Sequence, residues 1–267
     1  MDFQVSIVGG GVTGALLALI LGKSGISTCL IDKGKPSVKL SNPLQGRTTS
    51  LNLFSIETLK EAGIWEDIYP NARVFDEIFV WDAEGSSSVQ FNAFEIDKKE
   101  LGVIVHNNII LQAIFNSLQN LPEVTLIEEE SLAKIFEDQN TIDLTTESGK
   151  KISSDILIGA DGSLSRVRDL SKIPIRKWSY DQLAIVSSVK TTKPIGSIAF
   201  QIFTDTGPIA FLPLVEGTNH ASLIWSTDKS YGEKLLKLDK EALSQELRLK
   251  TEERFGEIDF CEDINSF

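Results

Sequence analysis

Residues 3–32 read FQVSIVGGGVTGALLALILGKSGISTCLID, and this stretch decides the fold of the first part of the chain. Phe3 to Val8 is a short run rich in β-branched residues, which predicts a buried strand. The apolar stretch from Val12 to Lys23 predicts a helix, and Ser27 to Ile31 predicts a second strand that ends at Asp32. A strand–helix–strand unit has a right-handed crossover, so we expect the two strands to be parallel.

Gly9-x-Gly11-x-x-Gly14 has the spacing of the dinucleotide-binding fingerprint, and it lies between the predicted strand and the predicted helix. Gly9 permits a tight turn, Gly11 leaves room for a pyrophosphate, and Gly14 lets the helix pack closely on the sheet. Unpaired N–H groups and the positive dipole end at the start of the helix favour phosphate. Asp32 is expected to accept hydrogen bonds from the adenosine ribose hydroxyls. The predicted nucleotide-binding residues of this region are Gly9, Gly10, Gly11, Thr13, Gly14, Asp32 and Lys33.

A second motif lies at residues 159–168, which read GADGSLSRVR and resemble the Gly-Ala-Asp-Gly-x-x-Ser-x-Val-Arg motif of flavoprotein aromatic hydroxylases. A strand followed by Asp-Gly and a helix start places a carboxylate at the carboxyl end of the sheet, where cofactors lie. The resemblance implies that Asp161 lies near the ribityl chain of FAD and the nicotinamide path, with Gly162 allowing close backbone approach. The alternative is that Asp161 is a helix N-cap and that Ser165 and Arg168 are solvated.

Two further residues match positions that this family places beside the flavin. Arg47 lies in the segment GRTTSL at residues 46–51, and Gln112 lies on a helix predicted from Asn108 to Leu118. The resemblance implies that both side chains contact FAD. The alternative for Arg47 is a solvated surface arginine, which is the usual state of an isolated loop arginine.

Three segments in the later part of the chain resemble the substrate domain of ubiquinone-biosynthesis hydroxylases: DQLAIV at 181–186, GPIAFLPL at 207–214 and SLIWS at 222–226. The resemblance covers residues 3–267. It implies an FAD-dependent monooxygenase that uses NAD(P)H and O2 to hydroxylate the aromatic ring of a polyprenylated phenol. Two alternatives remain open, namely an FAD monooxygenase acting on a soluble aromatic and a non-catalytic chain that binds nucleotide or packs against partners.

The order of predicted elements indicates an α/β protein with a Rossmann-like FAD-binding domain and an antiparallel β-sheet substrate domain, as in para-hydroxybenzoate hydroxylase. The FAD-binding domain is expected at residues 1–72 and 100–176, and the substrate domain at 73–99 and 177–267. Within this frame, residues 33–50 are expected to form a long loop and 231–255 to be helical. The family's third flavin-binding motif, Gly-Asp-Ala-Ala-His, is not found, so the chain is interpreted as truncated before a C-terminal flavin-binding segment.

The composition limits the kinds of partner. A formal net charge of −12 disfavours nucleic acid, which requires a basic surface. The acids at 128–130 are expected to form a solvated turn, and neither His106 nor His220 has a partner at metal-ligand spacing, so no metal is expected. Two cysteines and no long apolar segment indicate a cytoplasmic protein. A lipid-tailed substrate leaves open peripheral contact with the inner membrane and membership of a ubiquinone-biosynthesis complex.

Overall fold

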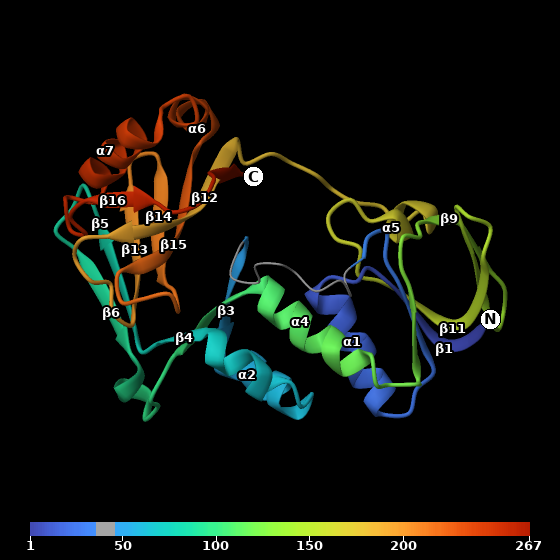
Figure 1. Ribbon diagram of the computed structural model, residues 1–267. Helices are drawn as coiled ribbons and strands as arrows, with labels where there is room; N and C mark the ends of the chain where they lie inside the picture. The colour runs from blue at the N-terminus through green and yellow to red at the C-terminus, as the bar shows by residue number, and fades with distance from the viewer. Residues whose placement is uncertain (36–45) are drawn as a thin grey trace. The chain divides into compact units, whose positions relative to one another are not determined.

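The computed structural model describes residues 1–35 and 46–267, which belong to two compact units (Figure 1). Of the described residues, the first unit comprises 1–35, Thr58–Ile68 and Asn107–Lys177, and the second comprises Gly46–Glu57, Tyr69–His106 and Trp178–Phe267. Both units are therefore assembled from segments far apart in the sequence. The domain boundaries expected from the sequence place residues 46–57, 69–72 and 100–106 with the FAD-binding domain, and they stay a prediction.

The first unit is built on a six-stranded sheet in the order β8-β2-β1-β11-β10-β9. The strands are β1 (Asp2–Val8), β2 (Thr28–Ile31), β8 (Val124–Ile127), β9 (Leu132–Glu137), β10 (Ile142–Thr146) and β11 (Lys151–Gly159). β1 runs parallel to β2 and to β11, and β2 runs parallel to β8, so the parallel arrangement predicted for the first two strands is confirmed. β10 pairs antiparallel with both β9 and β11. The carboxyl ends of four parallel strands therefore meet at one edge of the sheet.

Helices complete the first unit. They are α1 (Val12–Lys23), the end of α2 (Leu53–Glu61), α3 (Trp65–Ile68), α4 (Asn107–Leu118) and α5 (Arg166–Leu170). α1 and α4 pack against each other (Figure 1). α1 also lies close to the sheet, since a Cβ at Gly22 would come within 2.5 Å of the Val124 side chain. No helix in the described parts of the chain has both the length and the apolar character needed to cross a bilayer.

The second unit contains an eight-stranded sheet in the order β16-β12-β15-β14-β13-β5-β6, with β17 also paired to β12. The strands are β5 (Glu77–Asp82), β6 (Ser88–Asn92), β12 (Gln182–Thr191), β13 (Ile198–Thr204), β14 (Gly207–Pro213), β15 (His220–Asp228), β16 (Ile258–Phe260) and β17 (Asn265–Ser266). The sheet is antiparallel, as expected, except at one pair, because β5 runs parallel to β13. β5 comes from a distant segment of the chain, so no hairpin constrains its direction.

A separate three-stranded sheet also belongs to the second unit. It has the order β3 (Thr48–Asn52), β7 (Gly102–His106) and β4 (Ala72–Phe75), and two short 3-10 helices, η1 (Tyr69–Asn71) and η2 (Ala93–Ile96), lie near it in sequence. The loop predicted at 33–50 is therefore wrong at 48–50, which pair with β7; residues 36–45 of that prediction lie outside the described residues. The Thr48 hydroxyl donates to the Ser222 hydroxyl at 2.9 Å, which links β3 to the larger sheet.

Two helices cover one face of the larger sheet, in the region where the sequence predicted helix over 231–255. α6 (Lys229–Leu235) and α7 (Lys240–Lys250) are separated at Asp239, whose carboxylate accepts from Ala242 N at 2.8 Å and caps α7. A capping aspartate starts a new helix because it satisfies an N–H that the preceding turn cannot. The buried side chains of Leu243 and Leu247 pack on a cluster that includes Trp225.

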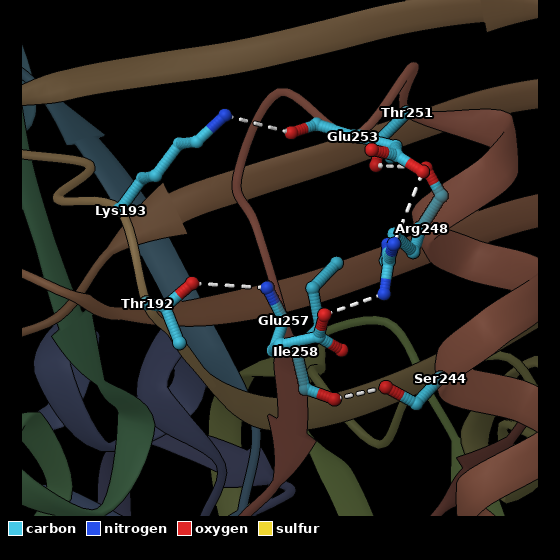
Figure 2. Close-up of polar contacts among 8 residues, drawn as sticks. All are labelled: Thr192, Lys193, Ser244, Arg248, Thr251, Glu253, Glu257 and Ile258. Carbon is cyan, nitrogen blue, oxygen red and sulfur yellow. Dashed lines mark hydrogen bonds and ion pairs between the residues drawn. The ribbon is translucent and has the colours of Figure 1, made fainter.

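Polar contacts fasten the end of α7 to the β16 edge of the sheet (Figure 2). The Arg248 guanidinium contacts the carboxylates of Glu253, at 3.1 Å, and Glu257. Glu257 N donates to the Thr192 hydroxyl at 3.0 Å, and the Lys193 ammonium donates to the Glu253 carbonyl at 3.1 Å. These contacts fix the position of the last turn of α7 relative to β16.

Candidate functional site

The two motifs predicted from the sequence meet in the first unit. Ala160 N, at the end of β11, donates to Val8 O at the end of β1 at 2.7 Å, and Gly9 N donates to Ile31 O at the end of β2 at 2.8 Å. The three turns that leave β1, β2 and β11 therefore lie side by side at the carboxyl edge of the sheet. In open α/β sheets this edge is where ligands bind.

The three glycines of the fingerprint have different physical roles. Gly9 has φ +113°, and a Cβ there would lie 2.3 Å from Ala160 O. A Cβ at Gly14 would lie 2.0 Å from Gly9 O. A Cβ at Gly11 would meet nothing within 4 Å. The protein's own packing therefore requires Gly9 and Gly14, whereas Gly11 borders open space that a ligand can approach.

The start of α1 has no side-chain cap. Gly11 is the N-cap residue, and no side chain accepts a hydrogen bond from the first turn. The first N–H groups of a helix lack intrahelical partners, and together with the helix dipole they attract anions. This local donor set suits a phosphate even though the protein is acidic overall.

Asp32 lies at the end of β2 with its carboxylate oriented by the backbone. Oδ2 accepts from Gly10 N at 2.6 Å, and Oδ1 accepts from Gly34 N at 2.7 Å. A carboxylate has about four acceptor positions. Both oxygens therefore keep acceptor capacity for the hydroxyls of a ribose.

The N-cap residue of α5 is Ser165, whose hydroxyl accepts from Arg168 N at 3.0 Å, so the alternative that made Asp161 the N-cap is wrong. Asp161 lies four residues before Ser165, and its carboxylate binds the same helix start. Its Oδ1 accepts from the Ser165 hydroxyl at 2.6 Å, and its Oδ2 accepts from Arg166 N at 2.6 Å and Val167 N at 3.2 Å. Burial acts to raise the pKa of this carboxyl, but the hydrogen bonds from Ser165, Val167 and Arg166 outweigh burial and lower it. The solvated state in that alternative is wrong for Ser165, which is buried, and for Arg168, which donates to Ser163 O at 3.0 Å.

These turns enclose a cavity of about 630 Å³. That size lies within the range of roughly 300–1,000 Å³ that small-molecule sites occupy. Its lining residues come from all the turns at the carboxyl edge: Val8, Gly9, Gly11, Ile31, Asp32, Lys33, Glu130, Ser131, Leu132, Glu147, Ala160, Asp161, Gly162, Leu164 and Arg166. The uncapped helix start, the open face of Gly11 and the acceptors of Asp32 are the chemistry that a dinucleotide requires, so the residues present fit such a cofactor.

The sequence reasoning missed Glu130 as part of this site. The solvated turn expected at 128–130 is wrong at this residue, because Glu130 is only 7% exposed and lines the cavity. Hydrogen bonds from Ser148 and Lys150 lower its pKa to about 2. A signal was available, because the residues after β8 must reach the same sheet edge as those after β1 and β2.

Five predicted site residues are not in this cavity lining: Gly10, Thr13, Gly14, Gln112 and Arg47. Thr13 is exposed in the first turn of α1. Gln112 lies on α4 of the first unit and donates to the Asn116 side chain at 3.0 Å. Arg47 belongs to the second unit, where its guanidinium lies 4.9 Å from the centre of the Phe267 ring. Contacts of these five residues with a flavin stay predictions.

Comparison with solved structures identifies the fold. A probable FAD-dependent monooxygenase from Pseudomonas aeruginosa, PqsL, matches with a TM-score of 0.84 at 18% identity and covers 100% of this chain and 73% of its own. The p-nitrophenol 4-monooxygenase PnpA from Pseudomonas putida DLL-E4 matches with a TM-score of 0.77 at 16% identity, over 100% of this chain and 68% of its own. The fold is that of the FAD-dependent monooxygenases, as predicted.

Sequence comparison is more specific. The model of the FAD binding domain family matches residues 2–263. The 3-demethoxyubiquinol 3-hydroxylase of Escherichia coli (strain K12) is 31% identical over 258 residues, and the ubiquinone hydroxylase UbiL of Rhodospirillum rubrum is 30% identical over 254 residues. These matches cover 96% and 95% of this chain but 65% and 58% of the relatives, so the chain spans less than two thirds of their length. The chain belongs to the FAD binding domain family, and the flavoprotein family inferred from the second motif is confirmed.

Proposed function

We propose that this chain is the cofactor-binding and substrate-binding part of an FAD-dependent monooxygenase that hydroxylates the aromatic ring of a polyprenylated phenol. One observation carries the proposal: the turn containing Gly9 and Gly11, the carboxylate of Asp32 and the Asp161-Gly162 turn line a single cavity. Flavoprotein hydroxylase chemistry needs the two ends of a dinucleotide to be held apart and oriented, and this cavity offers binding groups for each end.

Each residue in the cavity has a defined task. The N–H groups at the start of α1 would bind the pyrophosphate, and Asp32 would accept hydrogen bonds from the adenosine ribose. Asp161 holds the turn at Gly162 through its bonds to the start of α5, so backbone at Gly162 can approach the ribityl chain. Bound FAD would supply the redox chemistry with NAD(P)H and O2, while the protein orients it and excludes water.

The substrate class rests on the relatives. Two of them are named as a 3-demethoxyubiquinol 3-hydroxylase and a ubiquinone hydroxylase, and COQ6 of Danio rerio, at 30% identity over 257 residues, is named as a ubiquinone biosynthesis monooxygenase. A polyprenylated substrate partitions into lipid, so we also propose peripheral contact with the inner membrane and with other ubiquinone-biosynthesis proteins. Flotation of the chain with vesicles of inner-membrane lipids tests the membrane part.

Titration with FAD, followed by quenching of flavin fluorescence, tests the cofactor site. We expect saturable binding that Asp32→Ala weakens roughly 10- to 100-fold, because hydrogen bonds to a charged group contribute about 1.5–3 kcal/mol. Asp161→Asn should weaken binding less, since an amide keeps one acceptor oxygen for the helix start. Absence of binding at high micromolar FAD would refute the proposal for this chain and leave a non-catalytic packing role.

Product analysis tests the reaction and separates the two hydroxylase alternatives. The FAD-loaded chain is supplied with NADPH, O2 and either a polyprenylated phenol or para-hydroxybenzoate. We expect a hydroxylated product, coupled to NADPH oxidation, from the polyprenylated phenol alone. Hydroxylation of the soluble aromatic instead would favour a monooxygenase with a different substrate class, and NADPH oxidation without product would refute hydroxylase activity of this chain.

A further inference from the structure

Glu130 is a buried carboxylate for which the proposed chemistry has no direct use. The side chain is 7% exposed, and Oε1 accepts from the Ser148 hydroxyl at 2.5 Å and lies 3.0 Å from the Lys150 ammonium. These partners hold its pKa near 2, so it is ionised at neutral pH. Burying an ionised carboxylate is unfavourable unless partners compensate it, which makes the three-residue cluster a specific feature of this cavity.

Backbone hydrogen bonds connect Glu130 directly to the turn that carries Asp32. Glu130 N donates to Asp32 O at 2.9 Å, and Glu129 N donates to Gly34 O at 3.0 Å. Gly34 N in turn donates to the Asp32 carboxylate. The position of the Asp32 side chain therefore depends on where residues 129–130 lie.

The partners of Glu130 come from a third segment, the turn between β10 and β11. The Thr146 and Ser148 hydroxyls lie 3.1 Å apart, and Lys150 N donates to the Thr146 hydroxyl at 3.1 Å. Glu147 N, on the same turn, donates to Ser131 O at 2.9 Å. Asp32, Glu130, Ser131 and Glu147 all line the cavity, so three separate segments form one end of it.

We propose that Glu130 is a positioning residue for the adenosine end of the cofactor, an inference that rests on the proposed function. Its ionised side chain holds the β10–β11 turn through Ser148 and Lys150, while its backbone holds the Asp32 turn. The carboxylate thus sets the orientation in which Asp32 meets the ribose. Glutamine at this position keeps an acceptor for Ser148 but loses the attraction to Lys150, so it loosens the cluster without adding bulk.

Binding of ADP, which carries only the adenosine half of the cofactor, tests this inference in the full chain by calorimetry at pH 7. We expect Glu130→Gln and Ser148→Ala each to weaken ADP and FAD about tenfold and by the same factor, because both ligands share the adenosine end. Glu61→Gln, an exposed acid of the same unit on α2, is the matched control and should leave both affinities unchanged.

Hydrogen exchange supplies a readout that does not depend on a ligand. In Glu130→Gln the amides of Gly10 and Gly34, which bind the Asp32 carboxylate, should exchange faster, while those of β1 should not change. If the wild-type chain binds ADP and both variants bind it with the same affinity, the inference about Glu130 is overturned while the proposed function stands. Faster exchange throughout the unit would also overturn the inference, because it indicates a general loss of fold. Failure of the wild-type chain to bind either ADP or FAD would overturn the proposed function as well.

Discussion

Replacing Gly11 by alanine separates the needs of the fold from the needs of the ligand, and Gly14→Ala is its matched comparison. Gly11 has φ −68°, which any residue adopts, and its added methyl would point into open space. Gly14 is three residues further along the same helix, and its added methyl would lie 2.0 Å from Gly9 O. The two substitutions are chemically identical but meet different surroundings.

The expected magnitudes follow from these surroundings. Gly11→Ala reduces the conformational entropy of the unfolded chain, worth about 0.4–1 kcal/mol, and gives up a better N-cap residue, which costs a similar amount. Its unfolding free energy should therefore change by less than about 1 kcal/mol. Gly14→Ala forces backbone to move and should cost about 3 kcal/mol or more, or roughly 6–12 °C in Tm for a protein of this size.

The assay combines thermal unfolding, followed by circular dichroism, with FAD titration of each variant. If the pyrophosphate approaches the backbone at Gly11, the stable Gly11→Ala protein should bind FAD at least about tenfold more weakly, which corresponds to 1.4 kcal/mol. Unchanged FAD affinity in Gly11→Ala would refute the placement of the pyrophosphate. A loss of stability as large as that of Gly14→Ala would refute the open space at Gly11.

Three further predictions concern pH, thiol reactivity and the core. The pKa of Glu130 is lowered from 4.5 to about 2, so its stabilising contribution is present above pH 4.5 and is lost as the pH falls toward 2. In acid titration, Glu130→Gln should therefore lose less stability over this range than the wild-type chain. Identical titration curves for the two proteins would contradict this prediction. Burial raises the pKa of Cys29 to about 12, so iodoacetamide at pH 8 should modify only the exposed Cys261 in the native protein. Mass spectrometry measures the labelling of each cysteine, and equal labelling of both would contradict the burial of Cys29. In denaturant unfolding, Leu247→Ala should reduce the unfolding free energy by about 2–5 kcal/mol, because this side chain is buried. Leu249 is 67% exposed on the same helix, so Leu249→Ala should change the unfolding free energy by less than about 0.5 kcal/mol. Equal effects would be inconsistent with this orientation of α7.

Local sequence determined the elements whose signals lie within a few residues of one another. The β-branched run before Gly9, the apolar helix after Gly11 and the acid that ends β2 correctly predicted a parallel strand–helix–strand unit. The Asp161 motif pointed to the correct family because all seven specified positions of a ten-residue pattern matched it. Turn geometry, helix capping and side-chain periodicity act over short distances, so they can be read from adjacent positions.

Only the tertiary structure decided which distant segments meet. The backbone of Ala160 lies against Gly9, and Glu130 is buried against Ser148 and Lys150 although it sits in an acidic run that is typical of a solvated turn. The parallel pairing of β5 with β13 likewise has no local signal. These contacts join residues separated by tens to more than a hundred positions, and their stability comes from packing and from the compensation of buried charge, neither of which periodicity or spacing encodes.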